Sequence, residues 1–122
     1  MKEDLQSAYS LGRCGEEAAM RYLERKKFRI VAQGFRLFRG EIDIIAYDKA
    51  TLVFVEVKTR RSREFYSPEE SVTPAKQKQI RKIAQGFLAL HKIMEVECRF
   101  DVLSLIKTDR GEYIIRHFKN AF

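Results

Sequence analysis

Residues 40–59 read GEIDIIAYDKATLVFVEVKT, two apolar runs separated by a short polar stretch. Runs rich in Ile, Val and Phe that are bounded by turn residues are typical of β-strands. We expect strands over residues 41–47 and 52–59, joined by a turn at residues 48–51 that lacks the usual glycine. An antiparallel hairpin is therefore the predicted centre of the fold.

This hairpin brings charged side chains together. If its centre lies between residues 49 and 50, residues whose numbers add to 99 face each other, so Asp43 faces Glu56 and Glu41 faces Lys58. Directly opposed residues have Cβ atoms roughly 4.5–5.5 Å apart, and like charges at that distance destabilise a sheet. The register therefore predicts a carboxylate pair that needs a compensating charge.

The strand period of two sorts the remaining side chains onto two faces. We expect one face to be apolar and buried, made of Ile42, Ile44, Ala46, Val53, Val55 and Val57. The other face carries Glu41, Asp43, Glu56 and Lys58 among apolar neighbours.

A divalent cation would compensate Asp43 and Glu56, because Mg²⁺ binds carboxylate oxygens together with water and substrate phosphates. Lys58 lies on the same face, where a lysine can orient a metal-bound water or balance charge on a phosphate. The alternative is a solvated outer face on which Lys58 simply pairs with Glu41 or Glu56. The residues themselves leave both interpretations open.

A helix over residues 7–27 is expected before the hairpin, and it carries Glu16 on its apolar side. A carboxylate in that position needs an explanation. Residues 28–38 favour a strand interrupted by Gly34. The polar stretch over residues 60–74 is typical of a long loop inside one domain spanning residues 1–122.

A second helix should begin at Thr73 as N-cap with Pro74 at its first position. Strands are expected over residues 99–106 and 112–118. The order α-β-β-β-α-β-β predicts an α/β fold with a mixed sheet flanked by helices.

The formal net charge of +7 comes from 24 Lys and Arg against 17 Asp and Glu, and it favours a polyanionic partner. Basic residues near the hairpin are candidate phosphate contacts: Arg60, Arg61, Arg63, Lys76 and Lys78. Ordinary solvated charges are the alternative. His91 and His117 receive no role.

Two cysteines far apart make a zinc site or a disulfide scaffold unexpected. The polar N-terminus predicts no signal peptide, and no run approaches a membrane span. We expect a cytoplasmic protein that does not bind membranes.

Asp43 followed by Glu56-x-Lys58 on the next strand resembles the PD-(D/E)XK nuclease superfamily. More specifically, the chain resembles the YraN-like family of small bacterial proteins. The matching runs are residues 12–16, 40–45, 53–60, 99–102 and 120–122. Members of that family often carry Asn where Gly34 stands, and Gly near Tyr66, so the resemblance does not imply the shape of the substrate-facing loops.

This resemblance implies a restriction-endonuclease-like core similar to Holliday-junction resolvases. It implies that Asp43, Glu56, Glu16 and the main-chain carbonyl of Val57 bind Mg²⁺ or Mn²⁺, and that Lys58 assists the attacking water. The expected reaction is hydrolysis of phosphodiester bonds in DNA, with branched or damaged DNA as candidate substrates. Because such relatives cut two strands, a homodimer is the assembly suggested by analogy.

The sequence is also compatible with two other functions. The same fold could serve as a non-catalytic nucleic-acid-binding module, with DNA a better candidate than RNA. It could also be an adaptor whose basic face binds an acidic protein. The sequence therefore leaves open whether the protein is an enzyme.

Overall fold

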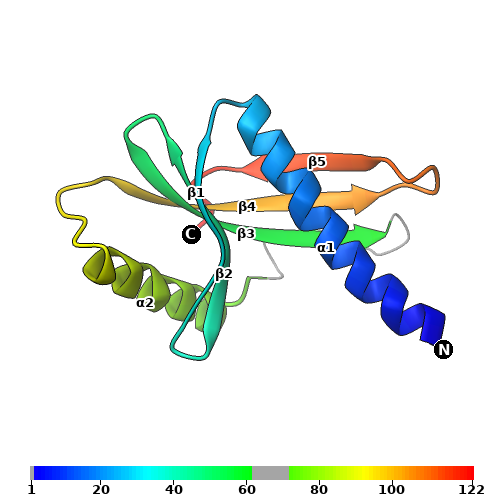
Figure 1. The fold of residues 1–122 in the computed structure, drawn as a ribbon, viewed down its shortest axis with the longest axis horizontal. Coiled ribbons are helices and arrows are strands. Elements are labelled where there is room, and N and C mark those ends of the chain that lie inside the picture. The colour runs from blue at the N-terminus through cyan, green and yellow to red at the C-terminus, as the bar shows by residue number, and fades with distance from the viewer. Residues whose placement is uncertain (1, 62–71) are drawn as a thin grey trace.

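A computed structural model describes the backbone of residues 2–61 and 72–122, and the side chains from residue 14 onward within those ranges. The elements are α1 (Lys2–Arg25), β1 (Arg29–Leu37), β2 (Gly40–Asp48), β3 (Thr51–Arg61), α2 (Pro74–Leu90), β4 (Cys98–Lys107) and β5 (Tyr113–Phe118). The predicted order of helices and strands is confirmed (Figure 1).

The five strands form one mixed sheet in the order β1-β2-β3-β4-β5. All neighbours are antiparallel except β3 and β4, which are parallel and are connected through α2. The predicted mixed α/β sheet is therefore confirmed. No helix in the described ranges is long and apolar enough to cross a membrane.

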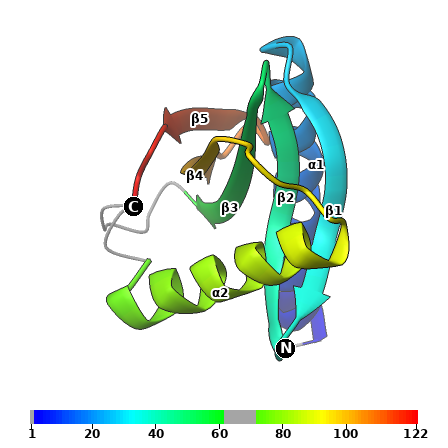
Figure 2. The same ribbon diagram turned by 90° about the vertical axis from the view of Figure 1, so that its left-hand side faces the viewer.

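The two helices cover opposite faces of the sheet (Figure 2). Alternation along β3 supplies both cores: Val53 and Val55 pack with Ala19 and Leu23 of α1, whereas Phe54 packs with residues of α2. The buried residues of α2 recur at helical spacing, namely Ile80, Ile83, Ala84 and Phe87. The sheet thus separates two hydrophobic cores, each closed by one helix.

Helix α2 begins as its sequence predicts. Thr73 is the N-cap, its hydroxyl accepts a hydrogen bond from the Lys76 N–H at 3.2 Å, and Pro74 follows at the first helical position. A side-chain acceptor there satisfies one of the backbone donors left free in the first turn. The loop predicted over residues 60–74 is shorter at both ends, because β3 extends to Arg61 and α2 begins at Pro74. Residues 62–71 lie outside the described chain.

The end of α1 differs from the expectation. The helix stops at Arg25 because Lys27 adopts a left-handed φ of 71°. The Phe28 N–H donates to the Leu23 carbonyl and the Lys27 N–H donates to that of Glu24, which is a Schellman cap. Lysine is an unusual residue for this position, so the sequence carried no signal for it.

Strand β1 also runs without the expected interruption at Gly34. Gly34 has a φ of +63°, a conformation that Gly and Asn adopt more readily than other residues. The irregularity in pairing with β2 lies instead between Ile30 and Ala32.

The predicted register of the central hairpin is confirmed from Ile44–Val55 to Asp48–Thr51, where paired numbers add to 99. The predicted apolar face is wrong at Ile42. That side chain joins the core under α2, whereas Ile44 joins the core under α1. In a regular strand Ile42 and Ile44, two residues apart, would point to the same face. They point to opposite faces, so the side-chain alternation of β2 breaks at Asp43.

A glycine sets how closely α1 approaches the sheet. A Cβ atom at Gly15 would overlap the Thr59 hydroxyl of β3. Alanine favours a helix over glycine by about 1 kcal/mol, so helix propensity alone would make Gly15→Ala stabilising. A loss of stability in this variant would therefore report the close contact with Thr59. The helix can therefore lie against β3 only because this position has no side chain.

We expect Gly15→Ala to lower the free energy of unfolding by about 1–3 kcal/mol, because an extra carbon in a packed contact forces the backbone apart. Urea unfolding of the variant, of Thr59→Ala and of the double variant would measure this. Thr59→Ala should restore part of the loss in the double-mutant cycle. A Gly15→Ala protein as stable as the parent would contradict the close approach.

Candidate metal-binding site

The candidate site begins where β2 and β3 stop pairing. The last pair of the ladder is Ile44–Val55, one residue short of Asp43 and Glu56. The Val57 N–H instead donates to Asp43 Oδ2 at 2.7 Å. A side-chain oxygen thus satisfies a backbone donor of the next strand, which holds the half-buried carboxylate of Asp43 at the junction of the two strands.

Asp43 is surrounded by other carboxylates. Burial and, next in size, the charge of Glu56 raise its pKa to about 7, against the opposing effect of the Val57 N–H. The charges of Glu16 and Glu41 contribute in the same direction. We call Glu16, Glu41, Asp43 and Glu56 the acidic site.

Glu16 reaches the acidic site from α1, which explains its position on the inner side of the helix. Burial raises its pKa, and so do the charges of Glu41 and Glu56, whereas a hydrogen bond with the Gln33 side chain lowers it. The structure therefore brings together three of the predicted ligand side chains, which lie on three different elements.

Lys58 and Glu56 form an ion pair, with 3.5 Å between Nζ and Oε1. Glu56 is buried, with a side-chain exposure of 7%, whereas Lys58 is 25% exposed. Among the described residues, Lys58 has this ion pair with Glu56 and none with Glu41. The pairing of Lys58 predicted by the plain charged-face interpretation is therefore present for Glu56.

The carboxylates do not form a closed cage. Within the described residues, no three His, Cys, Asp or Glu side chains are arranged to hold a metal ion. Mg²⁺ commonly uses only one or two protein carboxylates and completes its octahedral shell with water and phosphate oxygens. Asp43 and Glu56 supply carboxylate oxygens of that kind, beside the main chain of Val57.

The predicted phosphate contacts have different environments. Arg60 is buried with 7% exposure, which makes it a poorer candidate for a surface contact, while Arg61 and Lys78 are exposed. Lys76 is half-buried and lines a cavity that also contains Glu41. Arg63 lies outside the described residues. Phosphate binding stays a prediction for all of these residues.

Sequence reasoning missed two arginines beside the acidic site. Arg36 and Arg39 line the same cavity of about 590 Å³ as Lys76 and Glu41. Arg39 and its neighbour Phe38 form the β1–β2 turn with φ values of 59° and 51°, a conformation usually left to Asn and Gly. The signal was weak, because neither residue is typical of such a turn.

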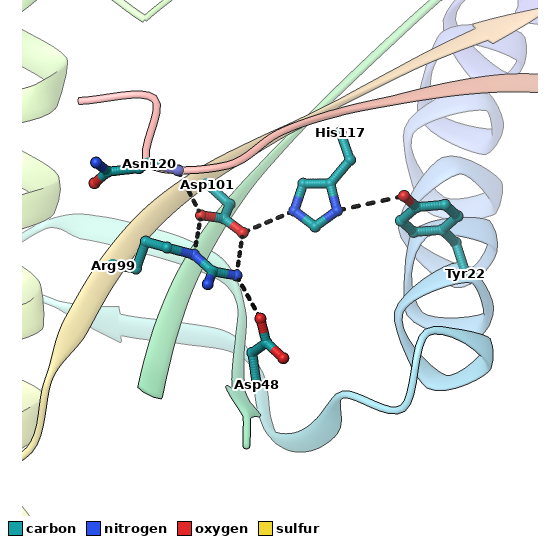
Figure 3. Close-up of polar contacts among 6 residues, drawn as sticks. All are labelled: Tyr22, Asp48, Arg99, Asp101, His117 and Asn120. Carbon is teal, nitrogen blue, oxygen red and sulfur yellow. Dashed lines mark hydrogen bonds and ion pairs between the residues drawn. The ribbon is translucent and has the colours of Figure 1, made fainter. Parts of the chain in front are cut away.

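Sequence reasoning also missed the partners of His117. Its Nε2 donates to Asp101 Oδ2 at 2.7 Å, and its Nδ1 lies 3.3 Å from the Tyr22 hydroxyl (Figure 3). Arg99 donates to both oxygens of Asp101 at 2.9 and 3.0 Å, and the Asn120 N–H donates to it at 3.0 Å. Only the tertiary structure brings these residues together, from α1, β4, β5 and the C-terminal segment.

This Asp101 network explains two runs that the family resemblance singled out. Residues 99–102 and 120–122 contact each other: besides Asn120, the Ala121 N–H donates to the Phe100 carbonyl at 2.7 Å. The rings of Phe100 and Phe122 stack at 5.2 Å. The network therefore fastens the end of the chain to the parallel strand β4.

The raised pKa of Asp43 predicts a stability change with pH. Between about pH 4 and pH 7 the folded protein keeps a proton on this carboxyl that the unfolded chain releases, so its contribution to stability falls as the pH rises. Asp43→Asn keeps an acceptor for the Val57 N–H but cannot ionise. In metal-free buffer at pH 8 we expect it to raise the free energy of unfolding by about 2–4 kcal/mol.

Urea unfolding at pH 8 and at pH 4 would measure this effect, which should be small at the lower pH because Asp43 is protonated in the folded state and still partly protonated in the unfolded chain. Asp109→Asn changes the same atoms at an exposed position and should have little effect at either pH. An Asp43→Asn protein that is less stable than the parent at pH 8 would contradict the carboxylate repulsion.

Comparison with known sequences places the chain in a family. The model of the Uncharacterised protein family UPF0102 matches residues 15–105. A UPF0102 protein of Geotalea uraniireducens (strain Rf4) is 46% identical over 120 residues, covering 98% of this chain and 94% of that protein. One from Chlorobium limicola is 48% identical over 119 residues, covering 93% and 92%.

A third relative, from Geobacter sulfurreducens, is 46% identical over 112 residues, covering 92% of this chain and 88% of its own length. The similarity thus extends over nearly the whole chain and includes the strands that carry the acidic site. The YraN-like resemblance seen in the sequence is confirmed at the level of the family. The protein belongs to the UPF0102 family.

Proposed function

We propose that this protein is a divalent-metal-dependent phosphodiesterase that hydrolyses DNA, with the acidic site as its catalytic centre. The observation that carries the proposal is the half-buried Asp43 carboxyl, whose pKa is raised to about 7 by burial and by the charge of Glu56. A fold seldom keeps such repulsion without a use, and perturbed carboxyls of this kind are concentrated at functional sites.

The residues present fit a hard cation. Asp43 and Glu56 would hold Mg²⁺ or Mn²⁺ through carboxylate oxygens, with Glu16 and the Val57 carbonyl as further ligands by resemblance to the PD-(D/E)XK superfamily. A bound divalent cation activates water and stabilises charge on a phosphodiester undergoing attack. Glu16 comes from α1 and the other ligands come from the hairpin, so the helix must stay docked for the site to be complete.

Lys58 is held beside the reacting centre by its ion pair with Glu56 at 3.5 Å. Its partial exposure leaves the ammonium group accessible to substrate. From this position it can donate a hydrogen bond to a phosphate oxygen and orient the attacking water. The ion pair therefore positions Lys58 for a catalytic role as well as balancing one carboxylate.

The surrounding charge supports DNA as the substrate. Arg36, Arg39 and Lys76 line the cavity that contains Glu41, so cationic groups border the acidic site. Phosphate contacts of this type hold a strand in register without reading its sequence. The left-handed backbone at Arg39 is consistent with a position kept for a contact, because strained residues are concentrated at functional sites.

A non-catalytic nucleic-acid-binding module is the second candidate. The Lys58–Glu56 ion pair favours it, because a lysine that neutralises Glu56 takes over part of the compensation that a metal would provide. Both candidates predict binding to DNA that weakens with salt, and only the first predicts cleavage.

Substitutions at Glu56 and Lys58 separate the two candidates. We expect Glu56→Gln to abolish Mn²⁺ binding measured by calorimetry and cleavage of branched DNA, because one ligand loses its charge. Lys58→Met should retain Mn²⁺ binding but reduce the cleavage rate by about 100-fold or more, as for removal of a group that assists proton transfer. Glu112→Gln, an exposed carboxylate outside the site, is the matched control.

Three results would decide the matter. Mn²⁺ binding by the parent that survives in Glu56→Gln would refute the proposed ligand set. Cleavage by Glu56→Gln at the parent rate would refute the catalytic centre. Salt-sensitive binding of branched DNA by the parent without any Mn²⁺-dependent cleavage would favour the binding module.

A further inference from the structure

A larger cavity lies at the other end of the β2–β3 hairpin. Its volume is about 880 Å³, and Tyr22, Lys26, Asp48, Lys49, His117 and Lys119 are among the residues that line it. We call it the basic cavity. Asp48 is five residues beyond Asp43 on β2, so the basic cavity is about 16 Å along the strand from the acidic site. The two sites are therefore distinct.

Unbalanced positive charge surrounds this cavity. Within the described residues, Lys26, Lys49 and Lys119 make no ion pair with a carboxylate. The nearby carboxylates of Asp48 and Asp101 both form ion pairs with Arg99, at 3.0 Å and 2.9 Å. Apart from His117, the charged residues of the lining are three lysines and Asp48, which together carry a net charge of +2. An anion entering the cavity would meet lysines that make no ion pair with a carboxylate of the described residues.

Part of the wall of the basic cavity consists of hydrogen-bonded polar side chains. Tyr22 and His117 both line it, and the Tyr22 hydroxyl is oriented by His117, which Asp101 holds in turn (Figure 3). Hydrogen bonds from His117, Arg99 and the Asn120 N–H outweigh the effect of burial and lower the pKa of Asp101, which stays ionised. The phenol is therefore a fixed polar group beside the lysines.

Lys49 occupies a strained position at this cavity. It lies in the β2–β3 turn with a left-handed φ of 56°, which Gly or Asn would adopt with less strain. A lysine there stabilises the turn less than either residue would. Lys49 also lines the cavity, which is a reason for a basic residue at this place.

We propose that the basic cavity binds the phosphoryl group of a nucleotide, with Lys26, Lys49 and Lys119 contacting the phosphate oxygens. Lysines bind phosphate as mobile point charges, and the net charge of the lining suits a dianion. The volume exceeds that of one phosphate and falls in the range of small-molecule sites, which leaves room for a nucleoside beside Tyr22 and Phe28. The site is independent of the acidic site and of any metal.

Lys49→Asn tests the proposal, because it removes the charge and suits the left-handed turn. Lys92→Asn is the matched control: Lys92 is exposed, has a φ of 53° and lies outside the lining. Calorimetry with a nucleoside 5′-monophosphate in EDTA should give saturable binding to the parent. We expect Lys49→Asn to weaken it about fivefold, as for loss of one partly exposed charge contact, and Lys92→Asn to leave it unchanged.

The urea concentration at the midpoint of unfolding should be at least as high for both variants as for the parent. A loss of affinity would then not reflect unfolding. A short single-stranded oligonucleotide, titrated in the same way, distinguishes the source of the phosphate. Lys49-dependent binding of the monophosphate indicates a free nucleotide, and Lys49-dependent binding of the oligonucleotide alone indicates a strand. No saturable binding of either probe, or an equal loss in both variants, would overturn the proposal. The EDTA keeps this outcome separate from failure of the nuclease proposal.

Discussion

The hydrogen bond from the Val57 N–H to Asp43 Oδ2, 2.7 Å long, is the constraint on which the acidic site depends. It lies where the ladder between β2 and β3 ends, and it satisfies a backbone donor that has lost its strand partner. The same bond holds the Asp43 carboxylate beside Glu56. Satisfying the backbone and concentrating negative charge are therefore two results of one contact.

Asp101 and Asp43 have opposite electrostatic settings. Asp101 receives hydrogen bonds from Arg99, His117 and a backbone N–H, which lower its pKa in spite of burial. Asp43 has one backbone donor against burial and neighbouring carboxylates, and its pKa rises to about 7. A compensated carboxylate stabilises the fold, whereas an uncompensated one retains an affinity for cations. This contrast separates the structural network from the candidate catalytic centre.

Local sequence patterns predicted the hairpin register, the Thr73–Pro74 helix start and the order of elements, because each follows from a short-range period or cap. The position of Ile42 was mispredicted, since alternation fails where Asp43 leaves the ladder. The end of α1 was mispredicted because Lys27 takes a place usually filled by glycine. In both cases a contact outside the local pattern decided the conformation.

The sequence by itself determined that Glu56 and Lys58 share one side of β3, because side chains two residues apart on a strand point the same way. It also determined that Glu16 is out of place on an ordinary amphipathic helix. Only the tertiary structure decided that Glu16 meets the hairpin carboxylates, and that His117 meets Asp101 and Tyr22. These meetings depend on how α1 crosses the sheet at Gly15 and Thr59, which is a packing relation between distant segments that no local period encodes.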